Sequence, residues 1–264
     1  TAAILIPAFL LAREWVAAGT DHPAEPAWGI KSLPGNETEI VFNLSGYYLE
    51  KVDQGKTRIT FPGGVPIMEK GAPDLPRMAR SIVIPDLGRM ELEIIESDYV
   101  DVPAIDLISS KGNITRDINP SSVPYTYGTA YETDTFYPQE TAFLRDPYIV
   151  RSLRGQAIVF QPLQYNPVAR VLRVYTHIKV RVRENGISTI NPLLRQPPGN
   201  SAAREYEYIY GQHFINFSIT STRYEPVEEG SRMLVICYGP FMEAMQPLVD
   251  WKNLKGMPTE LVDL

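Results

Sequence analysis

The sequence predicts a mainly β protein of 264 residues, in which a domain of short strands is followed by the first β-α-β unit of an α/β domain. Two observations carry this prediction. Up to about residue 222, short apolar runs are interrupted by many of the 23 prolines, a composition that favours turns and edge strands over long helices. From Arg223-Tyr224 onward the sequence pattern changes, because an apolar run, a helical segment and the start of a second strand follow one another.

Four segments in the first half of the chain are predicted to be strands. The clearest is residues 90–96, where Met90, Leu92 and Ile94 share one face and glutamates occupy the other. This alternation is typical of a sheet with one face in water. The other three predicted strands are residues 39–44, residues 57–61 before a Pro-Gly-Gly turn, and residues 79–84 before a Pro-Asp turn.

Residues 104–148 differ from what precedes them, because they are rich in Pro, Ser, Tyr and Thr and show little periodicity. A segment of this length without regular structure is uncommon in a compact domain and usually has a function. Two further strands are predicted after it, at residues 156–160 and 171–182, joined through the turn residues 165–167.

The predicted strand at residues 171–182 has one apolar and one cationic face. Its apolar face consists of Leu172, Val174, Thr176, Ile178, Val180 and Val182. The opposite face consists of Arg173, Tyr175, His177, Lys179, Arg181 and Arg183. Such a face is either a docking surface for an acidic partner or a solvated face that resists aggregation, and we favour the second interpretation.

Three segments are predicted to lie outside the folded β domain. Residues 1–21 contain an apolar run too short to span a bilayer, which we interpret as the remainder of a secretory signal; an amphipathic or buried helix is the alternative. Residues 22–37 are polar and contain prolines, which is typical of a linker or arm. Residues 186–222 are predicted to be a flexible, protease-accessible connector.

The segment that follows this change of pattern, residues 224–264, is predicted to be a β-α-β unit. The apolar run at residues 233–238 predicts a parallel strand covered on both faces. A helix is predicted from Pro247, a residue suited to a first helical position, to a stop at Gly256. A second strand is predicted from Thr259, and the unit is expected to expose one face of its sheet.

The composition excludes some classes of protein. The net charge is -6 and the isoelectric point is about 5.2, which argues against nucleic acid as the main partner. After the N-terminal run, the sequence contains no segment long and apolar enough to predict a membrane-spanning helix. The single cysteine, Cys237, lies in the apolar run at 233–238 and is predicted to be a small packed side chain rather than a nucleophile.

Several stretches resemble the gingipains, the C25 family of secreted cysteine peptidases. Residues 224–229, 232–236 and 249–256 resemble the start of the mature catalytic domain. The stretches that resemble the propeptide are residues 69–76, 110–112, 123–128, 154–156 and 162–168. The resemblance assigns residues 38–223 to a propeptide and residues 224–264 to the N-terminal fragment of a peptidase domain.

The resemblance implies a β-sandwich propeptide that helps the peptidase to fold and keeps it inactive, and a caspase-like α/β peptidase domain with a Cys-His dyad. Both dyad residues are expected beyond Leu264, so this fragment is expected to be inactive alone. Cys237, His22, His177 and His213 are given no catalytic role. No cofactor is expected in this fragment, and calcium is expected only in the catalytic region beyond it. The implied partners are the protein's own peptidase domain and protein substrates, and the implied location is outside or on the surface of a bacterium.

Two sites follow from the resemblance. Arg223 and Tyr224 match the residues on either side of the processing bond in arginine-specific relatives. In the loop at residues 109–117, Arg116 best matches the basic propeptide residue that blocks the specificity pocket, and Lys111 is the second candidate. A cationic side chain in an anionic pocket forms charge-assisted hydrogen bonds, which are bidentate for arginine. An ordinary interdomain arginine at 223 and a solvated loop arginine at 116 are the simpler interpretations.

A rival function is a secreted β-sandwich module for binding or adhesion, with a peptidase domain that is absent or no longer functional. The sequence beyond Leu264 would separate the two, because an intact His and Cys favours the enzyme. The preference of the peptidase for arginine or another residue does not follow from this sequence.

Overall fold

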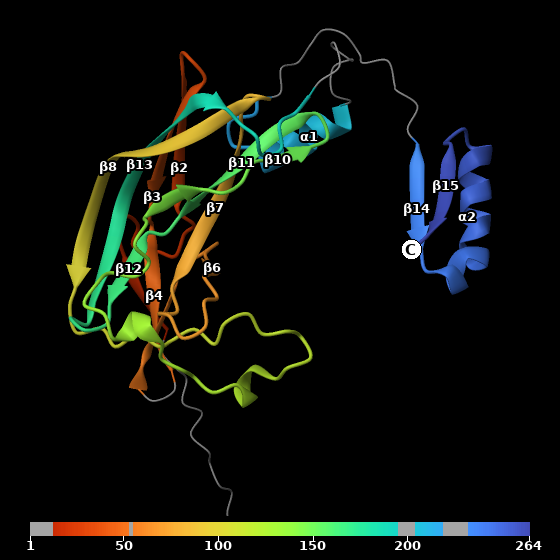
Figure 1. Cartoon of the computed structure of the whole chain (residues 1–264). Helices are drawn as coiled ribbons and strands as arrows, with labels where there is room; N and C mark the ends of the chain where they lie inside the picture. The colour runs from red at the N-terminus through yellow and green to blue at the C-terminus, as the bar shows by residue number, and fades with distance from the viewer. Residues whose placement is uncertain (1–12, 53–54, 195–203, 219–231) are drawn as a thin grey trace, which may run out of the picture. The chain divides into compact units, whose positions relative to one another are not determined.

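The structure, a computed structural model, describes residues 13–52, 55–194, 204–218 and 232–264. The chain divides into two compact units (Figure 1). The first comprises Thr1–Arg195 together with Gln212–Phe217, and the second comprises Gln196–Gly211 and Ser218–Leu264. Each unit has its own sheets, and the first contains the predicted β domain.

One sheet of the first unit has the strand order β12-β13-β3-β2, and β8 also pairs with β13. All of its pairings are antiparallel. Its strands are β2 (Ala27–Leu33), β3 (Glu37–Asn43), β8 (Gly88–Val102), β12 (Leu163–Asn166) and β13 (Val171–Ile187).

A second sheet has the order β10-β11-β7-β6, with β9 also paired to β11. Its strands are β6 (Val65–Pro66), β7 (Pro76–Val83), β9 (Ala142–Leu144), β10 (Tyr148–Val150) and β11 (Leu153–Phe160). A small third sheet has the order β1-β4-β5 and consists of β1 (Arg13–Ala17), β4 (Gly46–Lys51) and β5 (Thr57–Thr60).

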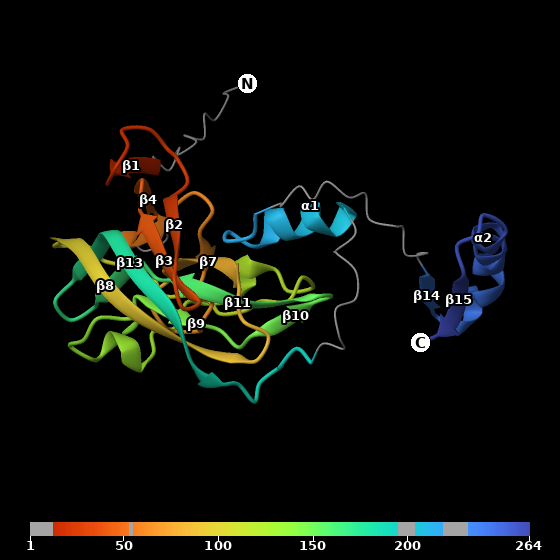
Figure 2. The same cartoon turned by 90° about the horizontal axis from the view of Figure 1, so that it is seen from above.

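The two large sheets pack face to face as a β-sandwich (Figure 2). Phe42 from β3 and Phe160 from β11 stack with their ring centroids 5.3 Å apart, and Trp28 from β2 meets both rings edge-on. One buried apolar cluster contains residues of both sheets, among them Ile40, Ile82, Ile158, Leu172, Val180 and Val182. The predicted mainly β fold is therefore confirmed, and so is the sandwich that the resemblance implied.

The apolar face of β13 is buried, as its alternation predicts, except for the half-buried Thr176, and Tyr175 of the opposite face is buried as well. Cations of that opposite face are paired with acidic neighbours. Arg173 forms a 2.8 Å ion pair with Asp101 of β8, and Arg181 forms one of 2.7 Å with Glu39 of β3. Arg183 forms a third ion pair, with its Nη2 3.6 Å from Oε2 of Glu91 on β8. These acidic partners within the sheet support a solvated structural face, since little unpaired charge remains for an acidic partner.

The prediction of a linker over residues 22–37 is wrong. Ala27–Leu33 form β2, which pairs with β3 along its whole length, and Trp28 is packed against the sandwich core. Part of the predicted signal segment is also in a sheet, because Arg13–Ala17 form β1 against β4 and Trp15 packs edge-on against Tyr48. Residues 1–12 lie outside the described part of the chain.

The prediction of a flexible connector over residues 186–222 is wrong for much of that range. β13 extends to Ile187, and the side chain of Arg154 binds the carbonyl oxygens of Ile190 and Asn191. Helix α1 (Arg204–His213) follows. The residues after α1 then pair with β7, where Ile215 donates to the Ser81 carbonyl and the Asn216 amide bonds both backbone groups of Val83.

The second unit contains the predicted β-α-β arrangement. β14 (Met233–Cys237) and β15 (Thr259–Asp263) pair in parallel, and α2 (Met242–Leu254) connects them. The unit exposes one face of its sheet, as expected: Val235 is buried, but Leu234 and Ile236 are 58% and 59% exposed, so the first strand is covered on one face only within this unit. The helix begins at Met242 rather than Pro247, because a short 3-10 turn at Gly239–Phe241 leads into it and Pro247 is accommodated inside. Gly256 ends it with φ 81°, as predicted.

Candidate functional site

The candidate site is a loop of residues 111–128, called here the projecting loop, whose two ends are anchored on one short segment. At its start, Ser110 donates to the Ala72 carbonyl and accepts from Gly71, at 2.8 and 2.9 Å. At its end, Gly128 donates to the Gly71 carbonyl at 2.9 Å. A Cβ at Gly71, which has φ 82°, would lie 3.1 Å from the Gly128 nitrogen, so this close approach requires glycine. The loop extends away from the sandwich in yellow-green in Figure 1.

Arg116 lies in a turn of the projecting loop. The turn is closed by a 3.1 Å hydrogen bond from the Ile118 nitrogen to the Thr115 carbonyl. The Arg116 side chain is exposed, and it has no hydrogen bond or ion pair within the described part of the chain. Hydrogen bonds from the Thr115 side chain and from Asp117's own backbone lower the pKa of the neighbouring Asp117 carboxyl, and within the described residues this carboxylate forms no ion pair with Arg116. The turn therefore presents a free guanidinium.

Lys111, the second candidate, is held inside the loop. Its Nζ donates a 2.7 Å hydrogen bond to the Pro120 carbonyl oxygen and lies 4.2 Å from the centre of the Tyr125 ring. The side chain is half-buried by these contacts. Its ammonium group is thus engaged within the loop, whereas that of a blocking residue must be free to enter a partner's pocket.

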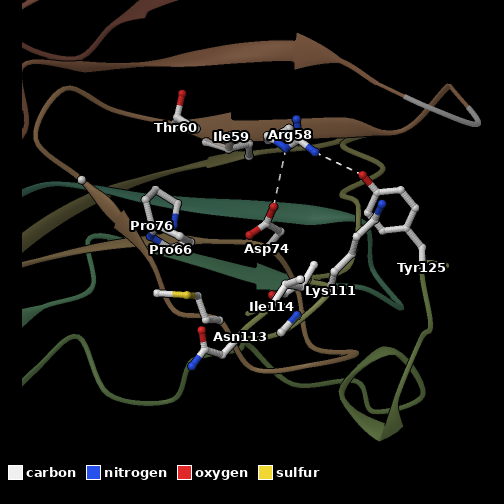
Figure 3. Close-up of a pocket in the computed structure, with 14 residues that line it drawn as sticks. Arg58, Ile59, Thr60, Pro66, Asp74, Pro76, Lys111, Asn113, Ile114 and Tyr125 are labelled. Atoms are coloured by element: carbon white, nitrogen blue, oxygen red, sulfur yellow. Dashed lines mark hydrogen bonds and ion pairs between the residues drawn. The ribbon is translucent and has the colours of Figure 1, made fainter. Parts of the chain in front are cut away.

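Tyr125 connects the projecting loop to the sheets (Figure 3). Its hydroxyl accepts a 3.1 Å hydrogen bond from Nη2 of Arg58 on β5, and Nε of Arg58 lies 3.6 Å from Asp74. Burial raises the pKa of the Asp74 carboxyl more than the nearby Arg58 lowers it. These side chains border a cavity of about 430 Å³ that separates the start of the loop from β5 and β7. Residues 123–128 resemble a propeptide motif, but neither Tyr125 nor Arg58 was predicted from the sequence to be a site residue.

The other residues considered in the sequence analysis are not part of this site. Arg223 and Tyr224 lie outside the described residues. Cys237 lies in the second unit, where its side chain is half-buried with its Sγ 3.3 Å from the Sδ of Met242. His22, His177 and His213 lie in the first unit but outside the projecting loop. His177 is bonded to Asn43 and His213 to Tyr148, both at 2.7 Å.

The described residues contain no group of three or more His, Cys, Asp or Glu side chains placed to hold a metal ion. Among the helices of the described segments, none is long and apolar enough to cross a membrane.

The chain is similar to known proteins over most of its length. A family model described as Propeptide_C25 matches residues 32–217. Gingipain R2 of Porphyromonas gingivalis strain W83 is 42% identical over 204 residues, covering 76% of this chain and 27% of the relative. Gingipain R1 of Porphyromonas gingivalis is 36% identical over 237 residues, covering 88% of this chain and 23% of the relative.

A solved structure described as a complex of the pro- and mature domains of RgpB from Porphyromonas gingivalis also matches. Its TM-score is 0.65 at 34% identity, and the match covers 74% of this chain and 100% of the matched chain. The chain spans about a quarter of the length of the curated relatives, 27% and 23%.

Proposed function

The chain belongs to the Propeptide_C25 family, and from this membership we propose that it is the N-terminal part of a secreted cysteine endopeptidase zymogen. In this proposal the sandwich is the propeptide, which helps the peptidase domain to fold and holds it inactive. The second unit is the beginning of the peptidase domain, with a caspase-like fold whose Cys-His dyad lies beyond this chain. The full protein would be secreted or held at the surface of a bacterium, where its substrates are proteins.

The propeptide is proposed to inhibit by placing Arg116 in the specificity pocket of the peptidase. The observation that carries this proposal is the free, exposed guanidinium in a turn of a loop whose two ends are anchored. A guanidinium matches a carboxylate with two parallel hydrogen bonds, so it can occupy an anionic pocket in the manner of a substrate. Lys111 is less suited to this role, since its ammonium already donates to Pro120.

Activation is proposed to follow cleavage between Arg223 and Tyr224. The two curated relatives are named as R-type gingipains, and one solved relative is described as a complex of pro- and mature domains. A cut after a basic residue would free the N-terminus of the peptidase and leave the propeptide as a separate chain. An arginine at both the processing bond and the blocking position agrees with an arginine preference, if the enzyme processes itself.

The experiment that tests this function follows the maturation of the full-length precursor. The wild-type precursor should be inactive, and activity should appear together with a new N-terminus at Tyr224. Arg223→Ala should remove or shift that N-terminus, whereas Arg145→Ala, at an exposed arginine after β9, should not change it. A precursor that remains uncut and never gains peptidase activity would instead support the secreted binding module.

A further inference from the structure

We propose that Lys111 and Tyr125 are positioning residues, which brace the projecting loop so that Arg116 is held in one preformed conformation. This inference rests on the proposed function, because it concerns how the blocking residue is presented. It assigns Lys111 a part in inhibition that does not require the side chain to enter the peptidase.

The first part of the brace closes the loop on itself. Lys111 stands at the beginning of the projecting loop and Pro120 nine residues further along it, and a 2.7 Å hydrogen bond joins the Lys111 ammonium to the Pro120 carbonyl oxygen. Arg116 lies between these residues in the sequence. The turns on the far side have local hydrogen bonds of their own, where Asn119 accepts from Ser121 and from Ser122. The Lys111 bond therefore fixes the separation of two short, locally ordered segments.

The second part connects the closed loop to the sandwich. The Tyr125 ring lies against the Lys111 ammonium at 4.2 Å, and a cation over an aromatic face is attracted by the ring's quadrupole. The Tyr125 hydroxyl is in turn bonded to Arg58 on β5. A continuous series of contacts thus runs from Pro120 through Lys111 and Tyr125 to a strand of the first unit.

The loop needs such a brace because apolar packing does not hold it. A cavity of about 430 Å³ lies between residues 110–114 and the wall formed by Ile59, Pro66 and Pro76. Residues 115–122 are all exposed. Ordering a free backbone costs conformational entropy, and a loop that is disordered before binding loses this entropy when it binds. A braced loop has already lost this entropy when the propeptide folds, so the loop inhibits the peptidase more strongly.

The test uses the full-length precursor and two measurements. One is the peptidase activity of the uncut precursor, and the other is the amide exchange rate of Ile118 and Ser122 in the loop. Lys111→Met removes the hydrogen bond to Pro120, and Tyr125→Phe keeps the ring but removes the bond to Arg58. Each should accelerate loop exchange and raise the activity of the uncut precursor about tenfold, since each removes a bond to a charged group. Lys111→Arg should restore both measurements, because it retains a cation that can donate to Pro120.

Arg116→Ala distinguishes the blocking role of Arg116 from the brace formed by Lys111 and Tyr125. It should release far more activity than the brace variants without accelerating exchange at Ser122. If Arg116→Ala releases activity while Lys111→Met and Tyr125→Phe change neither measurement, the brace is wrong and the proposed function stands. If Arg116→Ala leaves the precursor fully inactive, the blocking role itself is wrong, and the brace then has no part in inhibition. Unchanged thermal unfolding of the sandwich in both brace variants should accompany the expected result.

Discussion

The Nζ of Lys111 donates a 2.7 Å hydrogen bond to the carbonyl oxygen of Pro120. This bond distinguishes two basic residues that the sequence presents as rival candidates. Lys111 uses its ammonium within the projecting loop, whereas Arg116, which lies between Lys111 and Pro120, has no partner in the described residues. The blocking role is therefore proposed for Arg116 and a positioning role for Lys111.

Arg154 is predicted to be a large contributor to the stability of the sandwich. It is fully buried, and it donates to four backbone carbonyls, those of Pro85, Gly88, Ile190 and Asn191, at 2.6–3.0 Å. Arg154→Met leaves these acceptors without their partner and should lower the free energy of unfolding by about 3–5 kcal/mol. Urea denaturation measures the loss.

The control for Arg154 is a second arginine that the structure places in solvent. Arg145→Ala should change the free energy of unfolding by no more than about 0.5 kcal/mol. Arg154→Lys should fail to rescue stability, because an ammonium has three donors in a different geometry from the guanidinium fork. An Arg154→Met variant as stable as Arg145→Ala would contradict the prediction that Arg154 contributes strongly to the stability of the sandwich.

Asp74 and Asp101 should change stability with pH in opposite directions. Burial raises the pKa of Asp74, so its contribution is fully present below the unfolded pKa of about 3.9 and is lost as the pH rises through the folded value. The hydrogen bond from Arg173 lowers the pKa of Asp101, so the contribution of Asp101 is present above the unfolded pKa and is lost as the pH falls.

Denaturation of two variants between about pH 3.5 and pH 7 tests these signs. Relative to wild type, Asp74→Asn should become more stable as the pH rises, and Asp101→Asn should become less stable. The Asp101 effect should be small, because its side chain is 41% exposed and solvent screens the ion pair. An Asp74→Asn variant that loses stability as the pH rises would show that the Arg58 pair outweighs burial.

Asn216 should hold the segment after α1 on the edge of β7. Its Nδ2 donates to the Val83 carbonyl at 2.9 Å, and its Oδ1 accepts from the Val83 nitrogen at 2.7 Å. Asn216→Asp keeps the acceptor but places a carboxylate against a carbonyl oxygen. The amide of Ile215, which donates to Ser81, should then exchange about 5–30 times faster, the equivalent of roughly 1–2 kcal/mol.

Asn113→Asp is the matched control for this variant, since Asn113 is exposed in the projecting loop. It makes the same chemical change and should leave the exchange of Ile215 unaltered. Equal exchange rates in the two variants would mean that the Asn216 amide does not secure the segment.

The sheets were predictable where the signal is local. Residues 90–96 and 171–182 alternate with a period of two, and this period places their apolar side chains on one face whatever the neighbouring strands are. The partners of the cations on β13 were not predictable in this way. Asp101 and Glu39, which neutralise Arg173 and Arg181, come from strands far away in the sequence.

Some elements were missed because tertiary contacts override a weak local signal. β2 lies in a polar segment, and its position depends on pairing with β3 and on Trp28 packing against Phe42. Docking of residues 214–216 depends on Ser81 and Val83 of β7. Helix α1 did carry a signal, since Tyr206 and Tyr210 are four residues apart and share one helical face.

For the candidate site, the sequence indicated the loop but not the division of roles within it. The resemblance singled out Arg116 and Lys111 by residue type and position. Which of the two is free depends on Pro120 and Tyr125, and no pattern in the sequence predicts those contacts. The motif at residues 123–128 marked the right segment without revealing that Tyr125 bonds Arg58.

The most direct test of the account is the peptidase activity of the uncut full-length precursor carrying Arg116→Ala, with Arg145→Ala as the matched loss of one exposed arginine. Removing one partner from a buried, hydrogen-bonded charge pair costs about 2–5 kcal/mol, so Arg116→Ala should raise the activity at least about 30-fold. Arg145→Ala should leave the precursor as inactive as wild type. An Arg116→Ala precursor that remains equally inactive would contradict the central claim that Arg116 blocks the peptidase.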